Sequence, residues 1–357
     1  MRRICSLMLA VTLTMLVAAC SDDDNGGNGK TDSKVTNKET GPQPDTGPPP
    51  TELVCNSDCK DFVFSKITLP DSTTASKIGW DYDGDGSKNN ALGSILGALS
   101  GMAGSLNIQE SVDDGVNTGG TLVLLRIQAD DFKTDDDSKA QAWTGESIEC
   151  CSNPDDSAAC AAEAKTKCFG GSSTFYPAAD SPKDALFKGG IAASAMQYGP
   201  SKLKFILPFG NDAGNLDLNL KAVYLVGKMA ADGTSISEGV LAGAISKSEL
   251  DNTLIPKIAE MLDKTLNDPD QEQQIKDTIT TLFDTDKDGS ITKEEVAGNS
   301  IIKTFLSGDV DVDGDGENEL SLGVGFEAVS CTIDDKGTAP DAGPQPDAGT
   351  PDAAAGD

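Results

Sequence analysis

Histidine is absent from this chain of 357 residues, and its absence removes whole classes of chemistry. Ser-His-Asp and Cys-His nucleophile systems need an imidazole as general base, and many zinc sites need one as a ligand. The sequence also has neither a Walker-type phosphate loop nor a nucleophile elbow. Paired carboxylates that cleave glycosidic bonds need no histidine, but acidic pairs are common in any chain this acidic and indicate little. We therefore expect a protein that is not an enzyme.

Positive charge is scarce as well. The chain has 28 Lys and Arg against 58 Asp and Glu, a formal net charge of −30. Without residues 1–19, which hold two arginines, 26 basic residues remain against 58 acidic ones, and the net charge becomes −32. A surface of this sign repels nucleic-acid phosphates and anionic membranes, so we expect no nucleic-acid partner. Bound divalent cations would cancel part of the excess.

The N-terminal apolar run, from Ile4 to Val17, is shorter than the ~20 residues of a membrane-spanning helix. Its basic start and small-residue end are typical of a secretory signal peptide, here residues 1–19. The sequence Val17-Ala18-Ala19-Cys20 resembles the lipobox of bacterial lipoproteins, whose cysteine is acylated and becomes the new N-terminus. The resemblance implies a lipid anchor at Cys20 and an extracytoplasmic place in the bacterial cell envelope, on the outer membrane or cell surface. An ordinary cleaved signal is the alternative.

Two stretches lack the large apolar residues that a folded core needs. Residues 20–50 and 335–357 are rich in Asp, Gly and Pro, and GPQPDTG at 41–47 nearly recurs as GPQPDAG at 343–349. Such segments stay disordered, and proline makes them extended spacers. Because the segments that join the remaining apolar stretches are short, we expect one secreted domain over residues 51–334.

The cysteines indicate an oxidising compartment. Once Cys5 leaves with the signal and Cys20 takes lipid, seven remain: Cys55, Cys59, Cys150, Cys151, Cys160, Cys168 and Cys331. A zinc site of the usual kind uses two pairs of ligands, each pair separated by a short spacer. This chain has only one short-spacer pair of cysteines, so disulfides are favoured. We predict two bridges within residues 150–168 and a bridge from Cys331 to Cys55 or Cys59. The odd count leaves one thiol unpaired or bonded to a second chain.

Most of the apolar periodicity is that of β-strands. Alternation of apolar and polar residues marks residues 201–209 and 216–226, and three further strand segments are predicted at 62–69, 121–129 and 320–329. One face of 216–226 carries Leu216, Leu218, Leu220, Ala222, Tyr224 and Val226. Regular alternation is typical of half-buried antiparallel strands, and we predict a β-sandwich-like core.

One helical region interrupts this pattern and carries the strongest motif. A helix that starts near Asp268-Pro269 presents the apolar stripe Ile275, Ile279, Leu282 and Phe283. A 12-residue loop follows, with Gly289 at position 6 and oxygen ligands at positions 1, 3, 5, 7, 9 and 12: Asp284, Asp286, Asp288, Ser290, Thr292 and Glu295. Residues 269–306 therefore resemble the EF-hand family, which implies bound Ca²⁺ and a continuous exit helix from about Lys293 to Leu306. A plain acidic turn is the alternative. The fold class predicted is α+β, a sandwich-like core with a helical EF-hand insertion.

Two further loops, 81–93 and 311–323, share the pattern D-x-D-G-D-G and align without a gap. Their candidate metal ligands are Asp81, Asp83, Asp85 and Asn89 in the first loop, and Asp311, Asp313, Asp315 and Glu319 in the second. Position 12 is Leu92 or Leu322, which cannot bind metal. The loops are similar to the aspartate-rich calcium loops of extracellular proteins, and simple Asp-Gly turns are the alternative. Asp309 is a candidate additional ligand.

The function predicted is that of a lipid-anchored, secreted calcium-binding protein in which calcium is mainly a structural clamp between helices and β-core. The 25 residues from Asp284 to Asp309 are too few for a standard pair of EF-hands. A calcium-dependent adhesin or carbohydrate-binding module is the alternative, because Trp80 lies beside the first loop. With only two tryptophans, Trp80 and Trp143, the chain is poor in stacking surfaces, and Trp80 is expected in the core. The sequence identifies no protein or glycan partner.

Overall fold

A computed structural model describes residues 53–337 except 56–57, 72, 96–107 and 209–214. The predicted signal peptide, the lipobox with Cys20, the linker 20–50 and most of the tail 335–357 lie outside the described residues. The strands are β1 (Cys59–Thr68), β2 (Val123–Gln128), β3 (Lys139–Thr144), β4 (Thr174–Phe175), β5 (Leu186–Ala192), β6 (Ala195–Pro208), β7 (Asn215–Met229), β8 (Ser235–Ile245) and β9 (Leu320–Ile333).

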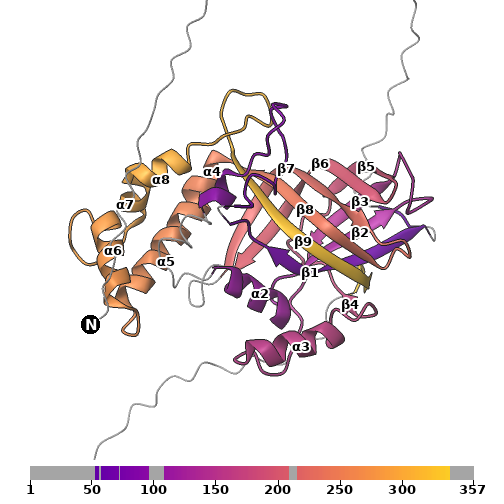
Figure 1. The fold of residues 1–357 in the computed structure, drawn as a ribbon, viewed down its shortest axis with the longest axis horizontal. Helices are drawn as coiled ribbons and strands as arrows, with labels where there is room; N and C mark the ends of the chain where they lie inside the picture. The colour runs from indigo at the N-terminus through magenta and orange to yellow at the C-terminus, as the bar shows by residue number, and fades with distance from the viewer. Residues whose placement is uncertain (1–52, 56–57, 72, 96–107, 209–214, 338–357) are drawn as a thin grey trace, which may run out of the picture. The chain divides into compact units, whose positions relative to one another are not determined.

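Eight of these strands form one closed antiparallel barrel (Figure 1). The sheet runs in the order β1-β2-β3-β5-β6-β7-β8-β9, and β1 pairs with β9 as well as with β2. The two-residue strand β4 joins β9 in parallel. Inward side chains fill the interior, with Phe62, Phe205 and Leu225 each 0% exposed. The barrel is thus a packed core.

The predicted fold class, an α+β sandwich-like core with a helical EF-hand insertion, is therefore wrong. The five predicted strand segments do lie in strands, namely β1, β2, β6, β7 and β9. Alternation reports only that one face of a strand is buried, and this holds equally for sandwiches and barrels. The pairing of β1 with β9, which closes the barrel, joins residues far apart in the chain, so alternation does not reveal it.

The predicted inner face of β7 is also partly wrong. Leu216, Leu218 and Leu220 point inward as expected, but Val223 and Leu225 are buried next, in place of Ala222 and Tyr224. A bulge shifts the register between Lys221 and Tyr224, where Ala222 has a φ of 44°. An extra residue in a strand moves the following side chains to the other face.

Two helices cover part of the barrel. Helix α2 (Ile108–Thr118) packs on β1 and β6 through its buried Ile108, Val112 and Val116. Helix α3 (Ser157–Lys167) packs on α2 and is fixed by the disulfides Cys150–Cys168 and Cys151–Cys160. The prediction of two bridges within residues 150–168 is confirmed, and the structure gives the pairing that the sequence left open.

The predicted pairing of Cys331 is wrong. Cys55 and Cys59 bond to each other across the start of β1, with their Cα atoms 5.6 Å apart, and Cys331 on β9 is the free cysteine among the described residues. Cys55 and Cys59 are four positions apart and form a local bridge, whereas Cys331 lies opposite Asp61 in the β1–β9 pairing.

A second group of helices lies between β8 and β9 in the chain and stands beside the barrel (Figure 1). Its members are α4 (Lys247–Glu249), a π-helical turn η1 (Leu250–Leu254), α5 (Ile255–Asn267), α6 (Gln273–Phe283), α7 (Lys293–Gly298) and α8 (Ser300–Phe305). Helix α6 starts at Gln273, later than the predicted Asp268-Pro269, which lies in a turn. The predicted continuous exit helix is broken at Asn299, whose side-chain NH₂ donates to Leu282 O and whose Oδ1 accepts the Ile302 N–H of α8.

Candidate functional site

Three clusters of carboxylates bring potential metal ligands together. In each cluster the three ligand oxygens lie within 4.8 Å of one another: Asp81, Asp83 and Asp85; Asp284, Asp286 and Glu295; and Asp311, Asp313 and Asp315. The clusters lie in the three loops that the sequence motif marks. Like charges this close disfavour each other's ionised form unless a cation or hydrogen-bond donors compensate them.

The three loops share one backbone path. Position 6 is a glycine with positive φ in all three: Gly86 at 88°, Gly289 at 86° and Gly316 at 86°. Position 4 is also left-handed, with Gly84 at 74°, Lys287 at 61° and Gly314 at 77°. Glycine adopts this region at little cost, whereas a lysine does so only when its surroundings enforce it. The loop 284–295 thus has the same turn as the other two despite lacking their glycine at position 4.

Hydrogen bonds within the loops follow the same plan. The position 6 N–H donates to the carboxylate at position 1, at 3.0 Å in Gly86–Asp81 and at 3.1 Å in both Gly289–Asp284 and Gly316–Asp311. The position 7 N–H donates to the aspartate at position 5, at 2.7, 2.8 and 2.8 Å in the three loops. In each loop, backbone donors therefore hold the aspartates of positions 1 and 5 in place.

Glu295, at position 12 of the loop 284–295, closes that loop. Its Oε1 accepts the Thr285 N–H at 2.7 Å, and its Oε2 accepts the Thr292 N–H at 2.9 Å. Thr292 in turn accepts the Glu295 N–H, which completes a capping box at the start of α7. The backbone N–H of Thr292, and then that of Thr285, lower the pKa of Glu295 to about 2. Glu295 is therefore an anion at neutral pH, without any metal.

Asn89 and Glu319 accept the backbone N–H of loop position 2 in the other two loops, as Glu295 does in loop 284–295. In loop 81–92 the position 2 N–H, that of Tyr82, donates to Asn89 Oδ1 at 2.9 Å. In loop 311–322 the position 2 N–H, that of Val312, donates to Glu319 Oε2 at 3.2 Å. In loop 284–295 the same position 2 donor, Thr285, reaches Glu295. Position 9 thus replaces position 12 as the closing side chain. The leucines at position 12, Leu92 and Leu322, are 1% and 0% exposed and belong to the core.

The remaining predicted ligands lie at the rim of the clusters or away from them. Asp288, Ser290 and Thr292 are exposed residues of loop 284–295. Asp309 is directed elsewhere: its carboxylate accepts the N–H of Ser321 at 2.8 Å and the hydroxyl of Ser321 at 2.6 Å. Asp309 therefore anchors the start of β9 beside loop 311–322.

A buried polar network joins the loops 81–92 and 311–322. Asn90, 5% exposed, exchanges two hydrogen bonds with the backbone of Gly323, both at 2.9 Å. The Ala91 N–H donates to the hydroxyl of Ser321, which donates onward to Asp309. Gly323 has no room for a side chain here, because a Cβ would lie 2.7 Å from the Gly79 Cα. The two loops therefore meet at the first residues of β9.

Both of these loops also contact the bulge of β7. From loop 81–92, the Tyr82 hydroxyl donates to Ala222 O at 3.1 Å, and the Trp80 ring stacks on Tyr224 with centroids 4.1 Å apart. Trp80 is half-buried, outside the barrel. From β7, the Lys221 ammonium reaches Asp313 and Glu319 of loop 311–322, and the hydrogen bond to Asp313 raises the pKa of Lys221. Nothing in the sequence links Lys221 to residues 313 and 319.

The loop 284–295 lies among the helices. Asp263 of α5 accepts the N–H of Ile291, the loop residue at position 8, at 2.9 Å. The side chain of Ile291 is 5% exposed, and Val296 of α7 is 0% exposed. The loop therefore links α6 and α7 to α5.

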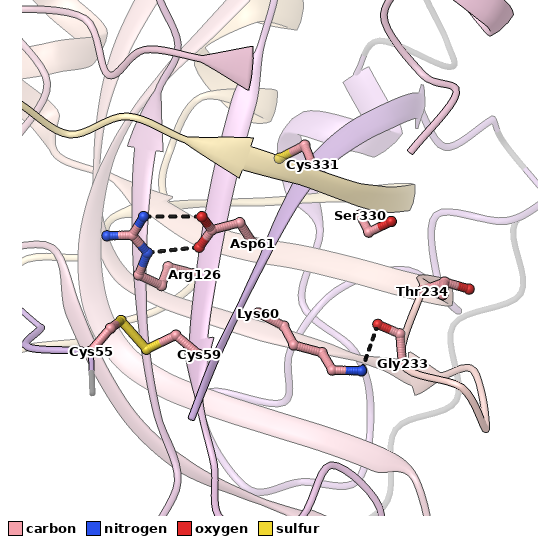
Figure 2. Close-up of a pocket in the computed structure, with 9 residues that line it drawn as sticks. All are labelled: Cys55, Cys59, Lys60, Asp61, Arg126, Gly233, Thr234, Ser330 and Cys331. Carbon is pink, nitrogen blue, oxygen red and sulfur yellow. Dashed lines mark hydrogen bonds and ion pairs between the residues drawn. A yellow bond between two sulfur atoms is a disulfide. The ribbon is translucent and has the colours of Figure 1, made fainter. Parts of the chain in front are cut away.

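A separate cavity of about 520 Å³ lies at the junction of β1, β2 and β9 (Figure 2). Its lining includes the Cys55–Cys59 disulfide and Cys331, and burial raises the pKa of the Cys331 thiol. Arg126 forms a bidentate ion pair with Asp61, at 2.7 and 3.0 Å, and a second ion pair with Asp335. Lys60 donates to the carbonyl oxygens of Asp232 and Gly233. The cationic side chains of this cavity are thus held by groups of the chain itself.

Comparisons of the chain with protein-family models, with curated proteins and with solved structures gave no match. In the part of the chain that the structure describes, none of the helices has the length and apolarity to span a membrane.

Proposed function

We propose that the protein is a secreted, calcium-binding lipoprotein whose three acidic loops each hold one Ca²⁺ ion. The donor sets contain only oxygen atoms from carboxylates, an amide and hydroxyls, which suit a hard cation. Calcium is preferred over magnesium because irregular loops of this kind do not impose a rigid octahedron.

The observation that carries the proposal is the shared backbone of the three loops. They lie in different surroundings, one between two helices and one leading into a strand, yet all have left-handed residues at positions 4 and 6. The same backbone donors point at the aspartates of positions 1 and 5. A strained Lys287 at position 4, in place of glycine, indicates that this path is maintained at a cost.

The role proposed for the ions is that of structural clamps. Ions in loops 81–92 and 311–322 would fix the start of β9, the strand that closes the barrel against β1. An ion in loop 284–295 would fix α6 and α7 against α5 through Ile291 and Asp263. Extracellular calcium is millimolar, so dissociation constants of ~10⁻⁴ to 10⁻³ M suffice for such modules.

The test is a calorimetric titration of the purified folded domain with calcium, together with thermal unfolding with and without a chelator. Three ions per chain are expected, and each site adds about 2.7 kcal/mol to the free energy of unfolding at a hundredfold excess over its dissociation constant. Chelation should lower the melting temperature most near neutral pH, where the carboxylates are charged.

The stabilisation should persist in high sodium chloride, because screening weakens only non-specific cation attraction. A melting temperature that ignores the chelator at neutral pH, or that sodium chloride raises as much as calcium does, would refute the clamp.

The lipid anchor belongs to the same proposal and is supported by the lipobox alone. Acylation of Cys20 would hold the domain at the membrane surface, and the linker 20–50 would act as spacer. The domain would then face a calcium-containing medium, outside the cytoplasm.

A calcium-dependent carbohydrate-binding module is the second candidate, favoured by the aromatic side chains beside the loops. Trp80, Tyr82 and Tyr224 are half-buried and lie together next to loop 81–92. However, Trp80 stacks on Tyr224 on the barrel side and Lys88 lies over its ring, 5.3 Å from the centroid. Binding to immobilised glycans that requires calcium and is lost in Trp80→Ala would favour this candidate over the clamp alone.

A further inference from the structure

Lys221 is a positive charge that the fold brings into one acidic loop from a distant strand. Its ammonium lies 3.1 Å from Asp313 Oδ2 and 3.4 Å from Glu319 Oε1. Asp313 belongs to the cluster of loop 311–322, and Glu319 closes that loop through the Val312 N–H. The Glu319 side chain is only 5% exposed, so its charge is largely removed from water and needs a compensating cation.

The position of Lys221 is fixed by the bulge of β7. The extra residue there places both Lys221 and Tyr224 on the outside of the barrel, although three positions separate them. Tyr224 packs against Trp80 of loop 81–92, and Tyr82 of that loop donates to Ala222 O inside the bulge. The backbone that follows Lys221 is therefore held by loop 81–92.

The loop 81–92 provides an internal comparison. It has the same backbone path and the same three aspartates, but its closing residue is the neutral Asn89 where loop 311–322 has Glu319. Its neighbouring lysine, Lys88, lies over the Trp80 ring. The closing residue is therefore charged and paired with a lysine only in loop 311–322.

We propose that Lys221 is a tethered cation that competes with the divalent ion for loop 311–322 and makes this loop the weakest of the three sites. This inference rests on the proposed calcium binding. While the loop holds no ion, the ammonium compensates one of the two negative charges of Asp313 and Glu319, and a divalent ion must displace it or bind against its repulsion. Because the ammonium takes the place of an ion, the loop keeps its shape at low calcium concentration. The loop then binds calcium only at high calcium concentration.

The direct test is a calcium titration of Lys221→Gln, with Lys228→Gln as matched control. Lys228 is an exposed lysine of the same strand, so the control removes the same charge from the same side of the barrel. Lys221→Gln should bind its weakest ion about threefold to tenfold more tightly, since one exposed positive charge near the ion is removed. Adding Asp313→Asn to Lys221→Gln should abolish the gain. Lys228→Gln should leave all three affinities unchanged.

A second readout uses the unmodified sequence and does not depend on how a variant folds. Acylation of lysine amines, followed by mass spectrometry of the peptides, should show Lys221 reacting faster when calcium is added, and Lys228 reacting at a constant rate. Equal calcium affinities in Lys221→Gln and the wild type, or a Lys221 reactivity that calcium does not change, would overturn the proposal while leaving calcium binding intact. A wild-type chain that binds no calcium would overturn the proposed function and this inference together.

Discussion

Replacing Glu295 with glutamine keeps the shape of the side chain but removes its charge and turns one oxygen into an NH₂ group. In the structure, Oε1 faces the Thr285 N–H at 2.7 Å and Oε2 faces the Thr292 N–H at 2.9 Å. Both threonine hydroxyls also lie within hydrogen-bond distance, at 3.1 and 2.9 Å. The NH₂ group of the introduced glutamine would leave one backbone donor facing another donor. Glu295→Gln should therefore act on the loop even when no calcium is bound.

The expected magnitudes differ between the calcium-free and calcium-bound protein. Without calcium, loss of one charged acceptor at a partly exposed site should cost about 1–2 kcal/mol of unfolding free energy. With calcium, a carboxylate about 2.5 Å from Ca²⁺ contributes about 3 kcal/mol even at the dielectric constant of water. The affinity of this site should then fall by roughly a hundredfold or more.

Urea unfolding in a chelator gives the first magnitude, and calorimetric titration with calcium gives the second. Glu294→Gln is the matched control, because Glu294 is the neighbouring residue, carries the same charge and has a side chain that is 74% exposed. The control should bind three ions with wild-type affinities. If Glu295→Gln matched this control in both assays, residues 284–295 would not form a calcium loop closed by Glu295.

Three further predictions concern the anchor, the core and the barrel closure. Cys20→Ser should move the protein from the membrane fraction to the soluble fraction because acylation is lost; retention in the membrane fraction would contradict the lipobox. Burial raises the pKa of Tyr198 from 10.0 to about 12, so the unfolded chain loses the phenol proton first and stability falls as pH rises from 10 to 12. Tyr198 alone should contribute about 1.4 kcal/mol per pH unit, and Tyr198→Phe should reduce the slope in denaturant titrations by about that amount, whereas an unchanged slope would contradict this reasoning. Burial also raises the pKa values of Tyr82 and Cys331, and these groups account for further slope over the same range. Asp61→Asn should lower the unfolding free energy by about 3 kcal/mol, because it leaves the Arg126 guanidinium, 11% exposed, without its bidentate partner. A loss equal to that of the surface variant Asp184→Asn would contradict this estimate.

The acidic loops were recognisable from sequence because their geometry is local. Each uses residues within one stretch of twelve, and glycine at position 6 is required by a left-handed turn that the structure contains three times. The strands of β6 and β7 were recognisable for a similar reason, since alternation requires only neighbours in sequence. The bridges Cys150–Cys168 and Cys151–Cys160 also join residues that are close in the chain.

Features that depend on distant residues could not be predicted in the same way. Closure of the barrel depends on the pairing of β1 with β9, which joins residues such as Phe62 and Ser330. The apolar run from Phe62 to Phe64 predicts a buried strand whether the sheet closes on itself or stacks on another sheet. The β7 bulge reversed the expected faces of Ala222 and Tyr224, because register shifts are set by the partner strands.

The candidate site shows the same division. The sequence by itself determined the three aspartate clusters and the position 12 glutamate of loop 284–295, because backbone turns and charge spacing fix them within each loop. The closing contacts of Asn89 and Glu319 are local as well, because each side chain accepts an N–H seven positions away. Only the tertiary structure decided that Lys221 reaches Asp313 and Glu319. These contacts depend on how β7 and β9 pass each other in the closed sheet, and residues 221 and 319 are 98 positions apart in the chain.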